Sequence, residues 1–146
     1  MPETEVIESI RAEIASSIQN ISVSKPNRIS IHVDKANLKR VVEFSVNKGF
    51  SHLSAITALN NDDHVEILYH LSGGGVLVTV RITLSPGDDS VPTITDIIPG
   101  ALLHEREVHD LFGVKFEGHP DLRPLLLPEN WPKNIHPMRK SRAIER

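Results

Sequence analysis

The spacing of apolar residues changes along the chain, and each spacing predicts a different element. Residues 4–19 place an apolar side chain at every third or fourth position, which is the period of an amphipathic helix. Residues 28–34, "RISIHVD", alternate isoleucine or valine with serine and histidine, so they predict a strand with one buried face. Residues 34–49 return to the helical period, with Asp34 placed to cap this second helix and Gly49 to end it.

Three β-rich runs follow, at residues 52–60, 64–71 and 75–84. The short segments "NDD" and "SGGG" separate them, which predicts an antiparallel meander with short turns. "SGGG" is not expected to cradle a phosphate, because no lysine and no helix follow it, and we interpret it as a hairpin turn. After a proline-rich turn, "TITDII" at residues 93–98 predicts a further short strand.

The third predicted helix, which Pro99-Gly100 opens and Gly113 ends, has apolar residues on two sides. One side carries Leu103, Glu107 and Leu111, and the nearly opposite side carries Ala101, Val108 and Phe112. A helix of this kind is usually packed between its own sheet and a second surface. We expect that second surface to be the C-terminal segment or another protein.

Charged residues occupy the strip between these two apolar sides, where Arg106 lies among Glu105, Glu107 and Asp110. A charge between two packed surfaces must be paired, because an unpaired buried charge is strongly destabilising. An arginine fork can satisfy two carboxylates. Glu105 and His109 form a second pair at helical spacing, as Arg106 and Asp110 do. We therefore expect a paired charge network at an interface.

The character of the sequence changes after Gly113. Residues 114–146 carry prolines at positions 120, 124, 128, 132 and 137, a density that excludes a helix or an inner strand. "LLL" and Trp131 make this segment too apolar for a solvated linker. We expect residues 1–113 to form a two-layer α+β domain whose mixed, mostly antiparallel sheet has its helices on one face. Residues 114–146 would form an extended, proline-rich tail that docks on a partner.

Bulk composition excludes several functional classes. The 146 residues include no cysteine, which removes disulfides, thiolate zinc sites and cysteine-ligated iron–sulfur clusters from this chain. The formal net charge of -3 gives no general attraction to nucleic acid. The longest apolar runs are far shorter than the roughly 20 residues of a membrane helix, and the acidic N-terminus is unlike a signal peptide. We expect a cytoplasmic chain that meets a membrane only through a partner.

The stretch "HEREVH" is similar to the signature of a zinc peptidase. That signature needs two histidines four residues apart on one helix face, whereas His104 and His109 are separated by five positions and point about 140° apart. No nucleophile lies beside a base, so we assign no catalytic, cofactor-binding or metal-binding residue. A metal-dependent hydrolase using His104, His109 and His119 stays open as an alternative, as does a free-standing soluble binding protein.

Residues 105–123 carry a longer pattern: Glu-Arg-Glu, two residues, Asp, an apolar residue, an aromatic residue and Gly, followed later by His-Pro-Asp-Leu-Arg. This pattern resembles the signature of the 30-kilodalton subunit family of respiratory complex I, the NADH dehydrogenase of the respiratory chain. The family has counterparts in energy-converting membrane-bound nickel–iron hydrogenases and related complexes. The matching positions are Glu105, Arg106, Glu107, Asp110, Leu111, Phe112, Gly113, His119, Pro120, Asp121, Leu122 and Arg123.

Three positions depart from the family's pattern. Leu103 stands where tryptophan is frequent, Pro124 replaces the second arginine of Leu-Arg-Arg, and Ser141 replaces the aspartate that follows Arg-Lys. The contacts that those family side chains make are therefore not carried over to this chain. The segment "LLLPENWP" is more similar to the shortened tails of hydrogenase-type and F420-linked complexes.

The resemblance implies a non-catalytic assembly subunit in the peripheral arm of a membrane-bound, ion-translocating oxidoreductase. Such subunits carry no cofactor and brace the large subunit related to the nickel–iron hydrogenase catalytic subunit, beside a small iron–sulfur subunit. Iron–sulfur clusters and any nickel–iron site belong to those partners, and the complex holds the chain at the inner face of the cell membrane. The expected interface residues are Glu105, Arg106, Glu107, Asp110, Phe112, Gly113, His119, Pro120, Arg123, Trp131, Arg139 and Lys140.

Overall fold

The computed structural model describes residues 7, 8, 10, 12, 20–60 and 64–120. Its elements are β1 (Asn20–Lys25), β2 (Arg28–His32), the 3-10 turn η2 (Lys35–Asn37), α2 (Leu38–Asn47), β3 (His52–Asn60), β4 (Val65–Gly73), β5 (Val76–Leu84), β6 (Ser90–Pro92), α3 (Ala101–Phe112) and β7 (Lys115–Glu117). The helix predicted over residues 4–19 lies largely outside the described residues. Ile10, one of its apolar positions, is helical and buried.

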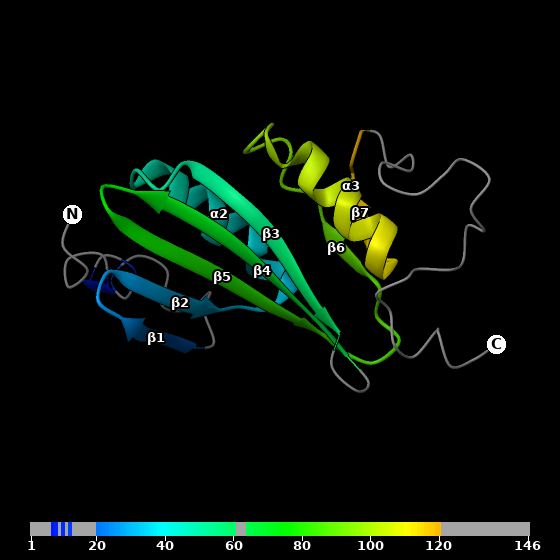
Figure 1. The fold of residues 1–146 in the computed structure, drawn as a ribbon, viewed down its shortest axis with the longest axis horizontal. Coiled ribbons are helices and arrows are strands. Elements are labelled where there is room, and N and C mark those ends of the chain that lie inside the picture. The colour runs from blue at the N-terminus through cyan, green and yellow to red at the C-terminus, as the bar shows by residue number, and fades with distance from the viewer. Residues whose placement is uncertain (1–6, 9, 11, 13–19, 61–63, 121–146) are drawn as a thin grey trace.

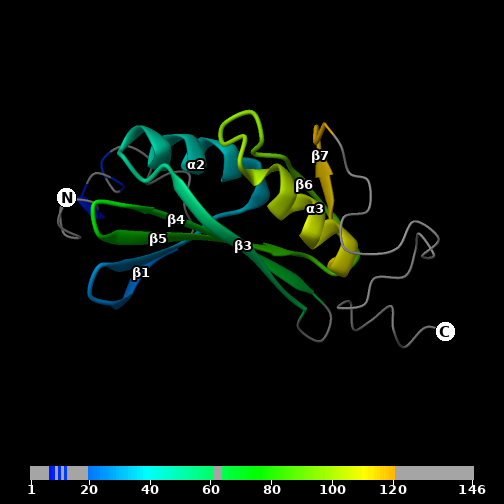
Figure 2. The same ribbon diagram turned by 45° about the horizontal axis from the view of Figure 1, so that its top comes forward.

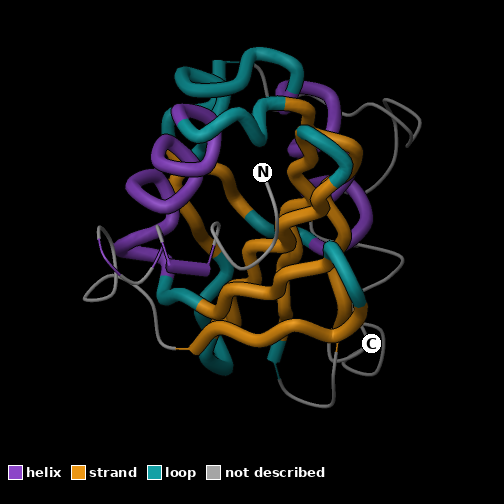
Figure 3. The backbone as a smooth tube through the Cα atoms, turned by 90° about the vertical axis from the view of Figure 1, so that its left-hand side faces the viewer, coloured by secondary structure: helices purple, strands orange, loops and turns teal. Residues whose placement is uncertain are grey.

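The main sheet has the strand order β1-β2-β5-β4-β3 (Figure 1). β3, β4 and β5 form an antiparallel meander, β1 pairs antiparallel with β2, and β2 pairs in parallel with β5. The strands twist strongly along the sheet, as Figure 3 shows. The prediction of a mixed, mostly antiparallel sheet built around a meander is confirmed.

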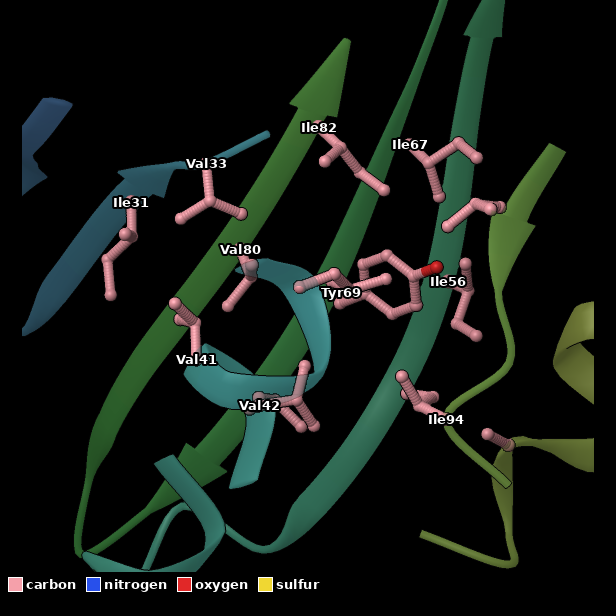
Figure 4. Packing of buried hydrophobic residues seen from close by; sticks show 14 of the residues in the cluster. Ile31, Val33, Val41, Val42, Ile56, Ile67, Tyr69, Val80, Ile82 and Ile94 are labelled. Atoms are coloured by element: carbon pink, nitrogen blue, oxygen red, sulfur yellow. The ribbon is translucent and has the colours of Figure 1, made fainter. Parts of the chain in front are cut away.

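Helices α2 and α3 lie on the same side of this sheet (Figure 2). α2 packs against β5, and α3 packs against β3. Because strand side chains alternate between faces, Tyr69 and Val80 point inward and meet Val42 of α2 in the core (Figure 4). The neighbouring residues His70 and Thr79 lie on the outer face, which no helix covers among the described residues. The predicted two-layer α+β architecture is confirmed.

Consecutive glycines shape the turn between β4 and β5. Gly74 and Gly75 have φ angles of 57° and 81°, the positive values that a two-residue type I′ hairpin turn requires. Gly73 is needed for a different reason, because a Cβ atom there would lie 2.0 Å from the carbonyl oxygen of Gly49. The "SGGG" segment is a hairpin turn, as its sequence predicts.

The prediction of a strand over residues 93–98 is wrong. These residues form a turn in which the amides of Ile97 and Ile98 donate to the carbonyl oxygen of Ile94 at 3.0 and 2.8 Å. The strand of this region is β6, which lies within the segment expected to be a turn and pairs in parallel with β7. Alternating apolar residues predicted a strand, but a buried carboxylate fixes the turn, as described below.

The expected role of Asp34 also differs in the structure. Its carboxylate accepts a hydrogen bond from the side-chain amide of Asn37 at 2.7 Å and caps no backbone amide, because η2 lies between Asp34 and α2. Gly49, with φ of 102°, follows the end of α2 as predicted. β7 pairs with β6 just beyond Gly113. The boundary at Gly113 between an α+β domain and a C-terminal tail stays a prediction.

Candidate functional site

Helix α3 has one buried and one exposed face. Ala101, Val108 and Phe112 are buried in the core, whereas the Leu103 residue is 54% exposed and Glu107 also faces solvent. The helical period produces this division. Leu103 is therefore an exposed apolar residue on the solvent-facing side of α3, whereas Leu111 of the same predicted side packs against the core.

Glu105 lies on the buried face of α3 and has no exposed surface. Thr93 Oγ1 donates to Glu105 Oε1 at 2.5 Å, and the backbone amide of Ile94 donates to Oε2 at 2.9 Å. These two bonds hold the 93–94 segment in a turn around the carboxylate. The predicted pairing of Glu105 with Arg106 or His109 is wrong, because the partners of this carboxylate come from outside the helix.

His119 reaches the same carboxylate from the segment that follows β7. Its side chain has no exposed surface, and its Nε2 atom lies 3.0 Å from the carbonyl oxygen of Leu102 and 3.9 Å from Glu105 Oε1. Because a carbonyl oxygen can only accept, Nε2 carries a proton. The His119 amide also donates to the carbonyl oxygen of Phe116 at 3.0 Å. His119 thereby attaches residues 118–120 to α3.

Tyr69 of β4 faces this group from the sheet. Its hydroxyl group points toward β3 (Figure 4), and its buried Oη atom has no hydrogen-bond partner. Burial raises the pKa of Tyr69 well above its usual value, and the charge of Glu105 raises it further. The hydroxyl therefore stays protonated. We call Tyr69, Thr93, Glu105 and His119 the Glu105 cluster.

Burial dominates the electrostatics of Glu105 and raises the pKa of its carboxyl group. The hydrogen bonds from Thr93 and Ile94 and the proximity of His119 act in the opposite direction, while Asp96 adds to the rise. Asp96 itself is exposed, and its hydrogen bond from Lys39 Nζ at 2.6 Å lowers its pKa. The Glu105 carboxyl group consequently holds its proton more strongly than an exposed glutamate does.

Reasoning from sequence identified Glu105 and His119 but missed Thr93 and Tyr69. Thr93 lies in the segment predicted as a strand, so no role was assigned to it. Tyr69 is one of the alternating inward residues of β4 and looks like any other core position. No sequence spacing joins these four residues, because they come from a strand, a turn, a helix and the segment after β7. The cluster is closed to solvent at Glu105, Tyr69 and the His119 side chain, so it is suited to fastening segments together.

The remaining predicted interface residues lie in different environments. Asp110 is buried and Arg106 is half-buried, and both have interaction partners. Phe112 belongs to the core, and Gly113 adopts φ of 76° at the end of α3. Pro120 is exposed. The predicted residues that lie outside the described part of the chain are Arg123, Trp131, Arg139 and Lys140.

His109 of the "HEREVH" stretch contacts the residues that follow α3. His109 Nδ1 lies 2.9 Å from the carbonyl oxygen of Val114, and the Gly113 amide donates to the His109 carbonyl oxygen at 2.9 Å, so both contacts secure the end of α3. Among the described side chains, no group of three His, Asp or Glu residues converges on a point that could hold a metal ion. Nor does the described part of the chain include a helix long and apolar enough to cross a membrane.

Comparison with known proteins matches residues 31–146 to the family described as "Respiratory-chain NADH dehydrogenase, 30 Kd subunit". The chain is 37% identical over 112 residues to an NADH-quinone oxidoreductase subunit of Moorella thermoacetica, with 74% of each chain covered. It is 34% identical over 122 residues to formate hydrogenlyase subunit 5 of Escherichia coli. The alignment covers 78% of this chain and 21% of that protein.

Among solved structures, a trypsin-resistant fragment of Nqo5 superposes with a TM-score of 0.70 at 29% identity, covering 84% of this chain and 100% of the fragment. This likeness confirms the α+β fold predicted from the sequence. The matched residues include α3, His119 and the whole signature that suggested the resemblance. The chain therefore belongs to the 30 Kd subunit family of respiratory-chain NADH dehydrogenase.

Proposed function

We propose that this chain is a non-catalytic assembly subunit in the peripheral arm of a membrane-bound, ion-translocating oxidoreductase, either hydrogenase-type or complex I-like. One observation carries the proposal. The chain is similar over most of its length to two proteins whose names state different reactions, an NADH-quinone oxidoreductase subunit and a formate hydrogenlyase subunit. A module shared by enzymes with different electron donors is suited to holding subunits together rather than to binding either donor.

The side chains of the signature support a structural role. Glu105 and His119 are both used in contacts within the chain, where each fixes a segment against α3. The sequence also contains no cysteine that could ligate an iron–sulfur cluster. We therefore propose that the chain carries no cofactor, and that the iron–sulfur clusters and any nickel–iron site belong to its partners.

The exposed face of α3 is the proposed contact with the large subunit related to the nickel–iron hydrogenase catalytic subunit. Leu103 is 54% exposed, the highest value among the large apolar residues that are exposed in the described structure. Covering such a side chain on association is favourable, since it removes apolar surface from water. His119 joins residues 118–120 to the same helix, and we propose that the segment that follows them extends the contact with the partner.

The length of the formate hydrogenlyase relative gives independent support for a permanent neighbour. The matched region is 21% of that protein, so a relative of this chain is covalently joined to a much larger polypeptide. In the complex proposed here, the large subunit and a small iron–sulfur subunit would take the place of that covalent neighbour. The complex would then hold this chain peripherally at the cytoplasmic face of the membrane.

A matched pair of substitutions tests the proposal. Leu103→Glu places a charge on the exposed face of α3, and Leu59→Glu places the same charge on β3, where Leu59 is 44% exposed. Each tagged full-length chain would be expressed in the native host and purified from solubilised membranes. We expect wild type and Leu59→Glu to recover the large and iron–sulfur subunits, and Leu103→Glu to lose them while retaining the wild-type melting temperature.

Recovery of both subunits with Leu103→Glu would show that the exposed face of α3 is not the contact. If the wild-type chain itself is recovered alone, the assembly role is wrong and the free-standing binding protein becomes the better hypothesis. Stoichiometric zinc that disappears with His104→Ala or His109→Ala would instead support a metal-dependent enzyme. The three results are distinguishable in one set of preparations.

A further inference from the structure

Glu107 differs from the other ionisable residues of the signature that the structure describes. Glu105 and His119 bond to groups of this chain, and Arg106 and Asp110 also have interaction partners. Glu107 is exposed and makes no hydrogen bond or ion pair within the described part of the chain. Its carboxylate is therefore available to a group from outside the chain.

Glu107 lies one helical turn after Leu103 on the exposed face of α3. Four residues of a helix rise about 6 Å, so a surface that covers the Leu103 side chain also covers Glu107. The helix offers Glu107 no lysine or arginine at helical spacing, because the residues three and four positions away are Leu103, His104, Asp110 and Leu111. A surface that packs on this face of α3 must therefore itself satisfy the carboxylate.

The part of the chain around α3 is acidic. Residues 85–120 contain seven acidic and two basic side chains, a formal charge of -5 with histidine neutral. The described residues 20–60 and 64–84 contain seven basic and three acidic side chains, a formal charge of +4. Two lysines of this second part compensate two of the acids, in the pairs Lys35–Asp88 and Lys39–Asp96. The remaining excess of acids favours the approach of a cation to this end of the molecule.

We propose that the large subunit meets Glu107 with a cationic side chain, which lies beside the apolar contact that it makes with Leu103. The inference rests on the proposed function, since that function places the large subunit on this face. A carboxylate that loses water without gaining a partner is strongly destabilising, and no cation of the described chain bonds to Glu107. Arginine suits the position best, because its fork can bond both oxygens of one carboxylate.

The ion pair predicts how the complex responds to salt and to a change of charge. Dissolved ions screen the attraction between a carboxylate and a cation, but they do not screen the apolar contact of Leu103. Glu107→Gln keeps the size of the side chain and removes its charge, so it should weaken both the attraction and its dependence on salt. Glu107→Lys places like charges opposite one another and should be the most damaging change.

The release of the large subunit measures these effects. Each tagged full-length chain would be captured from solubilised membranes of the native host, and release would be timed in about 50 mM and about 500 mM sodium chloride. For wild type, we expect release to become severalfold faster in the higher salt. Glu107→Gln should release the subunit about tenfold faster in the lower salt and respond less to added salt. Glu107→Lys should not recover the subunit.

Glu43→Lys is the matched control, since Glu43 is exposed on α2 and likewise makes no hydrogen bond or ion pair in the described structure. It should recover the large subunit as wild type does. All the variants should keep the wild-type melting temperature, because neither carboxylate has a contact to lose. An equal loss with Glu43→Lys would overturn the proposal, since net charge would then explain the effect.

Failure of this inference is distinguishable from failure of the proposed function. If Leu103→Glu loses the large subunit while Glu107→Lys recovers it, α3 is the contact but no cation faces Glu107, and the inference is wrong. If both variants recover it, α3 is not the contact and both proposals are wrong. Should Glu107→Lys fail to fold, equal salt responses of wild type and Glu107→Gln would still overturn the inference.

Discussion

The outer face of the sheet and the Glu105 cluster are built from similar side chains but differ in their access to water. On the outer face, Arg81 Nε lies 2.7 Å from Glu66 Oε1, and His70 lies between Thr57 and Thr79 at 3.1 and 3.2 Å. The Arg81 and Glu66 side chains are 41% and 13% exposed, whereas Glu105 has no exposed surface. Both regions pair polar groups across chain segments.

Access to water decides what each pairing contributes. On the outer face, water can replace a lost partner, so such pairs contribute little to stability. In the Glu105 cluster, a removed partner leaves a buried polar group without compensation. The cluster also joins segments that lack extensive pairing of their own, since β6 and β7 form only a two-stranded sheet. The comparison therefore predicts unequal costs for matched substitutions.

Substituting each glutamate separately should give the largest difference in the free energy of unfolding. Glu105→Ala leaves the Thr93 hydroxyl group and the Ile94 amide without their acceptor, and we expect it to lower the free energy of unfolding by about 3 kcal/mol. Glu66→Ala should cost less than about 1 kcal/mol. Urea denaturation of both full-length variants measures the two values. Equal costs would show that burial does not separate the two regions.

Substituting one threonine in each region should show a smaller difference of the same sign. Thr93→Val removes the donor to Glu105 inside the cluster, with an expected cost of about 1–3 kcal/mol. Thr79→Val removes a contact of His70 on the outer face, and valine suits a strand, so its cost should stay below about 0.5 kcal/mol. Thermal unfolding would compare the pair. A more damaging Thr79→Val would contradict this order.

Tyr69→Phe should be neutral or stabilising, by up to about 1 kcal/mol. The substitution deletes a buried hydroxyl group that makes no hydrogen bond and keeps the aromatic ring in the core. The measurement is the midpoint of urea unfolding, with unchanged circular dichroism as the control for fold. A loss above about 1 kcal/mol would mean that the hydroxyl group has a partner, such as a buried water molecule.

The smallest expected effect is a pH dependence on the outer face. Partial burial lowers the pKa of His70. Its contribution to stability is therefore present above the unfolded value and is lost as the pH falls through the folded value. His70→Gln should reduce the loss of melting temperature between about pH 7 and about pH 5. An unchanged loss would assign it to other groups.

The sequence predicted the elements whose side chains follow a regular period. The meander, the second helix and the third helix appear where alternation or helical spacing places them, because burial of one face is a local rule. It failed at residues 93–98, where three isoleucines suggested a strand but Glu105 fixes a turn. That bond joins residues eleven positions apart through tertiary packing, so no local period records it.

The same limit explains the candidate site. Glu105 and His119 stood out because they belong to a recognisable signature. Their partners could not be predicted, because helical spacing favours His109 for Glu105 and an arginine fork suggested Arg106, whereas burial directs the carboxylate to Thr93 and Ile94. Thr93 and Tyr69 carry no local signal at all. The sequence thus identified Glu105 and His119. The other members of the cluster, Thr93 and Tyr69, became apparent only from the packing of β4, α3 and the segment after β7.

The parallel pairing of β2 with β5 has a consequence for the order in which the chain assembles. During synthesis the β1–β2 hairpin emerges before the meander, but β5, the strand it joins, is separated from it by α2, β3 and β4. The β3–β4–β5 meander needs only local contacts and should form early, because short loops close at little entropic cost. β1 and β2 are then the last of the described strands to join the sheet, and until β5 leaves the ribosome their apolar face needs temporary cover.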